Sequence, residues 1–162
     1  MSTLTAWVFP EAGAAERAVQ TLGSLQSQAM IQVQDAAIVT WESGKKKPKT
    51  RQLSDMTAAG ALGGTFWGML FGLIFFVPLL GAAIGAGIGA LAGSMTDVGI
   101  SDAFINSVKQ RVTPGTSALF VLSSDAVVDR VKDVFKDSNA ELIASNLSAD
   151  QEAKLREVFS EE

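Results

Sequence analysis

Few side chains in this sequence could do covalent or acid–base chemistry. The 162 residues include no His, no Cys and no Tyr, which excludes thiolate nucleophiles, disulfides, Cys/His metal sites and the usual proton shuttle near neutral pH. Carboxylates, lysines and serines remain, but they form no convergent set. Asp97 and Asp102 could at most hold a divalent cation weakly through oxygen ligands. We therefore expect no enzymatic activity, no resident metal and no cofactor.

The spacing that stands out belongs to glycines in an apolar segment. Between Met56 and Thr96 the chain has 41 residues without a charge, interrupted near the middle by Pro78. Because positions i and i+4 share one side of a helix, glycines at that spacing give a smooth stripe on which another helix can pack closely. The pattern predicts a glycine-zipper helical hairpin that turns at Pro78, with eight packing glycines: Gly60, Gly64, Gly68, Gly72, Gly81, Gly85, Gly89 and Gly93.

The two arms of this hairpin differ in how well they suit a bilayer. Arm one, residues 57–77, would reach about 30 Å as a helix, which is the thickness of a hydrocarbon core. Arm two, residues 79–96, is richer in Gly and Ala, so its insertion would depend on packing against arm one. The tip has no polar residue that would meet water on a far side. A full span, a re-entrant wedge and burial in a protein assembly all remain open.

A basic cluster stands just before arm one and consists of Lys45, Lys46, Lys47, Lys49 and Arg51. Beside an apolar segment, such a cluster is typical of a cytoplasmic membrane surface with anionic lipids. The alternative is a solvated turn of a soluble domain. Trp41 and Trp67 likewise suit either a membrane interface or a core. Met1 to Pro10 lacks the features of a secretory signal, so we predict a membrane-associated protein with its globular domain and both termini in the cytoplasm.

The charged residues all lie outside 56–96, where apolar spacing predicts the elements of a soluble domain. Pro10 suits the first turn of a helix that begins at Glu11. The alternation slips at Asp35, which predicts a bulge, and the apolar run 117–122 is typical of a strand buried on both faces. The expected elements are strands over 3–9, 31–41, 49–53, 117–122 and 141–147, and helices over 11–28 and 101–112 and from 124 and 148 onward.

Without 56–96 and the helices at 101–112 and from 148, the order of elements is strand, helix, strand, repeated once. This order is typical of the split βαβ arrangement of ferredoxin-like domains. Two right-handed crossovers would make a four-stranded sheet with helices on one face. We expect an α+β fold in which residues 1–55 and 97–162 form a ferredoxin-like domain and the hairpin 56–96 is inserted into it.

The sequence also resembles a bacterial family of unknown function, domain of unknown function 1269, whose members are often described as predicted membrane proteins. The resemblance spans almost the whole chain. It rests on the paired Gly-x-x-x-Gly arms, the stretch 96–102, the junction 112–120 and the ending Asn146-Leu147-Ser148. It implies membrane association and no established catalytic residues, so it supplies no active site.

Taken together, the residues predict a non-enzymatic, membrane-associated homo-oligomer whose hairpins pack together in or on the bilayer as a scaffold, wedge or pore. The alternative is a soluble, high-order homo-oligomer that buries the hairpins between subunits, since a free hairpin would expose a large apolar area. A third hypothesis is a small-molecule-sensing module that regulates a membrane partner. The net charge of −4 disfavours nucleic-acid binding. The expected partners are the chain itself and a lipid bilayer, with no nucleic acid and no small-molecule substrate.

Overall fold

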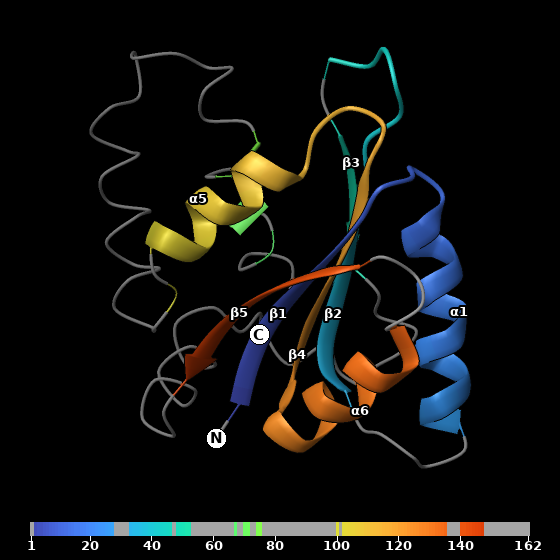
Figure 1. Cartoon of the computed structure of the whole chain (residues 1–162), viewed down its shortest axis with the longest axis vertical. Helices are drawn as coiled ribbons and strands as arrows, with labels where there is room; N and C mark the ends of the chain where they lie inside the picture. The colour runs from blue at the N-terminus through green and yellow to red at the C-terminus, as the bar shows by residue number, and fades with distance from the viewer. Residues whose placement is uncertain are drawn as a thin grey trace, which may run out of the picture.

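The computed structural model describes residues 2–27, 33–46, 48–52, 67, 70–71, 74–75, 100, 102–135 and 140–147. These residues form five strands and three helices (Figure 1). In chain order the elements are β1 (Ser2–Phe9), α1 (Ala14–Ser27), β2 (Val33–Thr40), β3 (Lys49–Gln52), α5 (Asp102–Arg111), β4 (Ser117–Ser124), α6 (Asp125–Phe135) and β5 (Glu141–Leu147). The helix predicted from residue 148 lies outside the described residues.

All five strands join one antiparallel sheet in the order β3-β2-β4-β1-β5. β4 lies between β1 and β2, and β1 lies between β4 and β5. The connections through α1 and α6 therefore each pass over one intervening strand. The register of β2 against β4 shifts between Val33 and Asp35, which confirms the bulge predicted at Asp35.

β4 occupies the centre of the sheet, and its sequence explains why. The five residues from Ala118 to Leu122 are all apolar and all buried. Because successive side chains of a strand point to opposite faces, Leu119 and Val121 pack on one face and Phe120 and Leu122 on the other. The predicted strand with two buried faces is confirmed.

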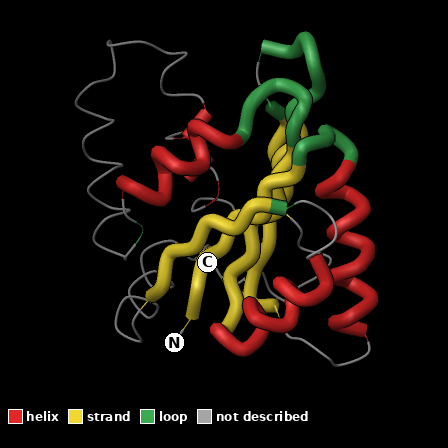
Figure 2. The backbone as a smooth tube through the Cα atoms, in the orientation of Figure 1, coloured by secondary structure: helices red, strands yellow, loops and turns green. Residues whose placement is uncertain are grey.

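Helices α1 and α6 cover one face of this sheet (Figure 2). Phe135, at the end of α6, meets Trp7 and Phe9 of β1 edge-on, with ring centroids 5.6 Å and 5.8 Å apart. Both helices bury one side at the three-and-four spacing of an amphipathic helix. The buried residues are Ala15, Ala18 and Leu22 of α1 and Val128, Val131 and Phe135 of α6.

The sheet departs in two ways from the expected four strands with helices on one face. It has a fifth strand because β3 pairs with the outer edge of β2, from Ala37 opposite Gln52 to Thr40 opposite Lys49. Its second face is also covered, by α5 and by residues of the apolar segment. That cover is required because Leu4, Phe120 and Leu122 on this face would otherwise contact water.

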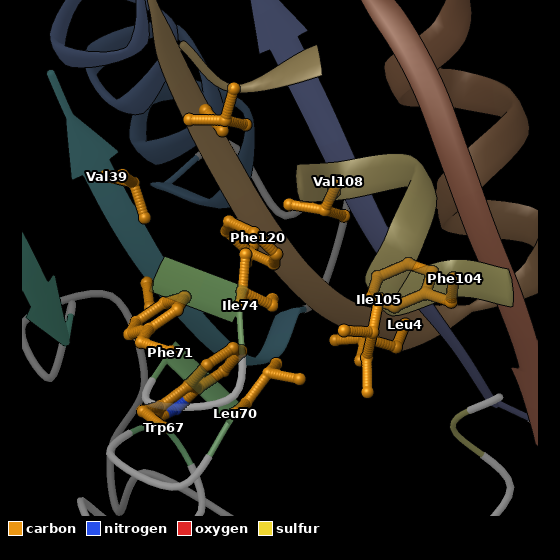
Figure 3. Close-up of a cluster of buried hydrophobic side chains, with 14 of the residues drawn as sticks. Leu4, Val39, Trp67, Leu70, Phe71, Ile74, Phe104, Ile105, Val108 and Phe120 are labelled. Atoms are coloured by element: carbon orange, nitrogen blue, oxygen red, sulfur yellow. The ribbon is translucent and has the colours of Figure 1, made fainter. Parts of the chain in front are cut away.

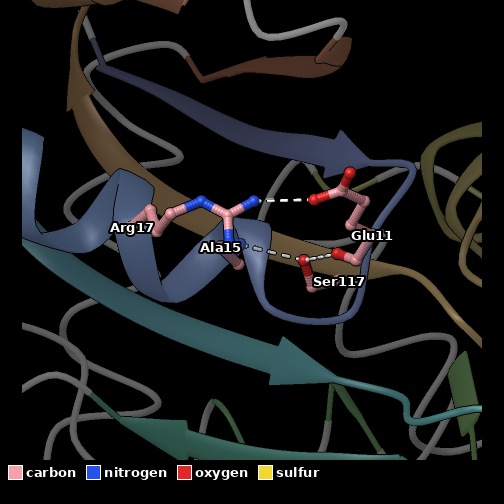
Figure 4. Close-up of polar contacts among 4 residues, drawn as sticks. All are labelled: Glu11, Ala15, Arg17 and Ser117. Atoms are coloured by element: carbon pink, nitrogen blue, oxygen red, sulfur yellow. Dashed lines mark hydrogen bonds and ion pairs between the residues drawn. The ribbon is translucent and has the colours of Figure 1, made fainter.

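The first helix begins at Ala14 and not at the predicted Glu11. Ser117 of β4 is fully buried. Its Oγ accepts a hydrogen bond from the N–H of Ala15 at 3.0 Å and donates one to the carbonyl of Glu11 at 2.6 Å (Figure 4). Pro10 and Glu11 therefore belong to the turn before the helix. The group that satisfies the helix N-terminus is supplied from 102 positions along the chain.

Candidate functional site

The face of the sheet opposite α1 and α6 is an apolar platform. Its side chains come from alternate positions of the three central strands and are all buried. Phe120, from the central strand, is the largest of them. The platform consists of Leu4, Ala6, Val8, Ala37, Val39, Ala118, Phe120 and Leu122. A surface of this composition needs an apolar cover in order to be stable in water.

Five residues of the predicted arm one provide part of that cover (Figure 3). The docked residues are Trp67, Leu70, Phe71, Ile74 and Phe75, and each is between 0% and 6% exposed. Their spacing places them on one side of a helix. The backbone is helical at Trp67, Leu70 and Phe71 and π-helical at Ile74 and Phe75. Part of the uncharged segment thus belongs to the core of the sheet domain.

Aromatic contacts fasten the docked residues to the platform. Phe71 meets Phe120 edge-on with ring centroids 5.1 Å apart, and Trp67 meets the same ring at 6.4 Å. Trp67 and Phe71 stack on each other at 5.7 Å. Such pairs contribute about 0.5–1.5 kcal/mol each beyond the burial of their surface. Of the two environments that Trp67 suits by sequence, the structure assigns it the core.

Helix α5 and its flanks cover the rest of the platform. Phe104, Ile105 and Val108 are buried on α5, and Ile100 and Val112 are buried before and after it. Figure 3 shows Phe104 and Ile105 beside Leu4 of β1. The docked residues and α5 therefore share one core, although the apolar segment continues between them in the sequence.

The last docked residue lies beside the turn between β2 and β3. Phe75 meets the indole of Trp41 edge-on at 6.2 Å. Trp41 Nε1 donates a hydrogen bond to the carbonyl of Lys45 at 3.0 Å. The backbone of Trp41 is paired with the loop before β4, through bonds to Thr116 at 3.0 Å and from Gly115 at 2.6 Å. The basic turn is therefore tied to the Phe75 end of the docked residues.

The structure separates the members of the predicted basic cluster. Lys45 and Lys46 lie in the turn after β2, whereas Lys49 and Arg51 lie in β3, and all four are exposed. Arg51 Nη2 pairs with both carboxylate oxygens of Glu16 in α1 at 3.2 Å. Lys47 lies outside the described residues. Of the described members of the cluster, only Lys45 and Lys46 therefore lie in the β2–β3 turn itself.

The eight predicted packing glycines from Gly60 to Gly93 and the predicted turn residue Pro78 lie outside the described residues, as does Asp97. Within the described ranges, no helix is both long enough and apolar enough to cross a membrane. In the same part of the chain, acidic residues form no group of three or more that could hold a metal ion.

A small cavity of about 270 Å³ opens where the chain leaves β1. Its two charged lining residues, Arg111 and Glu141, form an ion pair at 2.5 Å, and the others are Val8, Phe9, Pro10 and Thr116. Because these two residues pair with each other, they give the described lining of the cavity no net charge. The apolar platform is the feature that distinguishes this domain.

The docked residues carried a signal in the sequence that could have identified them. Positions 67, 70, 71, 74 and 75 are large, apolar and at helical spacing. Between residues 64 and 72 these positions stand among Gly64, Gly68 and Gly72. The four-residue repeat of the glycines predicts a glycine zipper and not a helix that packs on the sheet. The two patterns overlap on one side of the predicted helix, because Gly64 and Gly68 each lie seven positions before Phe71 and Phe75.

A family model described as "Protein of unknown function (DUF1269)" matches residues 61–160. The chain belongs to this family. The matched region includes the docked residues, α5, β4, α6 and β5. No curated protein and no solved structure matches the chain. The description of this family assigns no activity, so a functional proposal must rest on the residues and their geometry.

Proposed function

We propose that the protein is a non-enzymatic, membrane-associated homo-oligomer in which the segment 56–96 packs against copies of itself in or on the bilayer. The globular part is proposed to be a cytoplasmic, ferredoxin-like domain formed by residues 1–55 and 97–162, with β3 added at one edge and the docked residues as part of its core. The strand order supports this assignment, because β1 and β2 flank β4 while β4 and β5 flank β1.

The docked positions and the glycine positions of arm one are different residues, but they adjoin each other on a helix. Contact with the platform uses the large side chains from Trp67 to Phe75. None of these positions is one of Gly60, Gly64, Gly68 or Gly72. Gly64 and Gly68 lie seven positions before Phe71 and Phe75, which puts them on the docked side of a helix, so we propose that a second helix packs along the edge of that side.

The observation that carries the proposal is the composition of the whole segment. A helix that covers a sheet in water normally carries charged residues on its outer side. The 41 residues from Met56 to Thr96 carry none. The surface of this segment that does not contact the platform consequently needs another protein surface or lipid.

Light scattering after size-exclusion chromatography, with and without detergent, tests this proposal. The variant Gly64→Leu/Gly68→Leu should lose the assembly of the wild type, because leucine side chains prevent close helix contact. Gly23→Leu is the matched control, since a Cβ at Gly23 of α1 meets no atom within 4 Å. An assembly of unchanged mass in the double variant would contradict the role of the glycines.

The second candidate is a soluble, high-order homo-oligomer that buries the segment between subunits. The burial of the docked residues favours it, because those side chains are already withdrawn from water by the protein itself. The same measurement separates the candidates. A uniform particle of high mass without detergent supports the soluble assembly, whereas recovery only with detergent supports association with lipid.

A further inference from the structure

We infer that the β2–β3 turn forms the end of the domain that faces the membrane, and that it binds anionic lipid headgroups. This inference rests on the proposed membrane association. It adds an orientation of the domain, and it narrows the basic cluster that the sequence assigns to an anionic membrane surface to the lysines of this turn.

The charge of the turn supports the choice of an anionic surface. From Glu42 to Lys49 the sequence has four lysines and one glutamate. Lys45, Lys46 and Lys49 are exposed. Arg51, in contrast, is paired with Glu16 of α1. The lysines of the turn are therefore the members of the basic cluster that are placed to meet an external surface.

The backbone of the turn is held in place, so its lysines have a defined location. The N–H of Lys45 donates to the carbonyl of Glu42 at 3.2 Å, and Gly44 adopts a positive φ of 84°. Pro48 is buried at the end of the turn. The bond from Trp41 Nε1 to the Lys45 carbonyl attaches the turn to the core.

An aromatic side chain, that of Trp41, contacts the backbone of this turn. Trp41 is half-buried between the turn and the ring of Phe75. Indole rings favour the boundary between water and hydrocarbon. A cationic loop joined to an aromatic pair provides the two contributions on which binding at a membrane surface depends, namely electrostatic attraction and apolar contact.

The same end of the domain carries further cations and little uncompensated negative charge. Figure 1 shows the β2–β3 turn and the loop after α5 together at one end, with α6 toward the other. Lys109 and Arg111 stand in the last turn of α5. The acids here are Glu11, Glu16, Glu42 and Glu141, and all but Glu42 are paired, with Arg17, Arg51 and Arg111 respectively. The exposed acids Asp129 and Asp133 lie on α6 instead.

Flotation of the full chain with vesicles tests this orientation. One set of vesicles is phosphatidylcholine, and the other is phosphatidylcholine mixed with an equal part of phosphatidylglycerol. Since each basic residue near an anionic surface contributes about fivefold to binding, Lys45→Gln/Lys46→Gln should bind the anionic vesicles about 25-fold more weakly than the wild type. Arg130→Gln/Lys132→Gln on α6 makes the same change in net charge and should bind as the wild type does.

The outcomes separate the inference from the function on which it rests. If the wild type binds neither type of vesicle, membrane association itself is wrong and the inference falls with it. If the wild type binds both types equally, or the Lys45/Lys46 variant binds as tightly as the wild type, the inference alone is overturned. Selective loss in that variant, with the thermal unfolding of both variants unchanged, supports the orientation.

Discussion

The two faces of the sheet are covered by segments of different character. On one face, α1 and α6 bury apolar residues such as Leu22 and Phe135 and expose charged residues such as Glu16 and Asp129. On the other face, α5 is also amphipathic, but the docked residues come from a stretch of 41 residues without a charge. The first cover meets water on its outer side, whereas the docked segment of the second cover has no charged side chain with which to do so.

This difference suggests how one domain could combine its own stability with the proposed self-association. The amphipathic cover completes the fold on its own face. The uncharged cover satisfies the platform with its large side chains, and the rest of the uncharged segment is proposed to contact another surface. We therefore treat arm one both as part of the core and as the start of the proposed interface.

The largest expected loss of stability comes from removing one aromatic ring from the residues that cover each face of the sheet. Phe71→Ala and Phe135→Ala should each lower the free energy of unfolding by about 3–5 kcal/mol, the usual cost of emptying a buried phenylalanine site. Urea denaturation of the full chain provides the measurement. Val134→Ala on α6 is the control, because Val134 is 38% exposed and its truncation should change stability by less than about 0.5 kcal/mol.

If Phe71→Ala lowers the free energy of unfolding only slightly while Phe135→Ala lowers it fully, the comparison between the two faces is wrong. It would mean that the docked residues do not contribute to the core that unfolds. A loss of similar size at Phe71 and Phe135 would mean that both faces are parts of one cooperative unit.

The second-largest loss of stability is expected where hydrogen bonds join the start of α1 to β4 of the sheet. Ser117→Ala removes the group that joins the Ala15 N–H to the Glu11 carbonyl inside the core. Leaving such groups without a partner should cost about 1–3 kcal/mol, measured by urea denaturation. Thr21→Ala, which removes an exposed bond to the Arg17 carbonyl, should have almost no effect. Equal stability of Ser117→Ala and the wild type would show that this attachment is dispensable.

A smaller effect is expected where the chain passes from α5 into the central strand. Gly115 has a φ of +92°, and a Cβ there would lie 2.9 Å from Ser43 Oγ. Gly44 has a similar φ of +84° but open space around it. Alanine at either position should cost about 1–2 kcal/mol in backbone strain, and Gly115→Ala should cost more because of the contact.

A second substitution separates these two causes in thermal unfolding. Ser43→Gly should recover the part of the loss at Gly115→Ala that comes from the contact, and leave the part that comes from φ. If Ser43→Gly recovers nothing, the close approach to Ser43 is not the source of the additional cost.

The smallest effect belongs to the exposed charges on the α1 side. The side chains of Arg51 and Glu16 are 59% and 53% exposed. A double-mutant cycle with Arg51→Gln and Glu16→Gln should give a coupling of about 0–1 kcal/mol, which salt should weaken further. A coupling above this range that persists in high salt would mean that the ion pair fixes the β3 edge more firmly than its exposure indicates.

The strands and their central member could be predicted because their information is local. The alternation of β1, the slip at Asp35 and the apolar run of β4 each follow from the period of two in a strand. The start of α1 could not be predicted, because the group that satisfies its first N–H bonds is Ser117, far along the chain. Such a contact leaves no trace in the local spacing.

The cover of the second face could not be predicted for a different reason. Arm one carries two patterns, the glycines at every fourth position and the large apolar residues of the docked set. A helix pattern predicts which side is apolar but not which surface it meets, so the platform beneath Trp67 and Phe71 could not be assigned from spacing. The sequence predicts a strand over 49–53, which the structure confirms as β3, but the four-stranded ferredoxin-like arrangement does not include it.

The most direct test of the docked arm uses the emission of Trp67 in protein bound to vesicles with brominated acyl chains. Trp7→Phe/Trp41→Phe leaves Trp67 as the reporter, and Trp7→Phe/Trp67→Phe leaves Trp41. If arm one stays docked on the platform, Trp67 should keep the emission of a buried indole and should not be quenched. Trp41, at the proposed membrane-facing end, should be quenched. Strong quenching of Trp67 by the brominated chains would show that arm one leaves the platform for lipid, and would contradict the account.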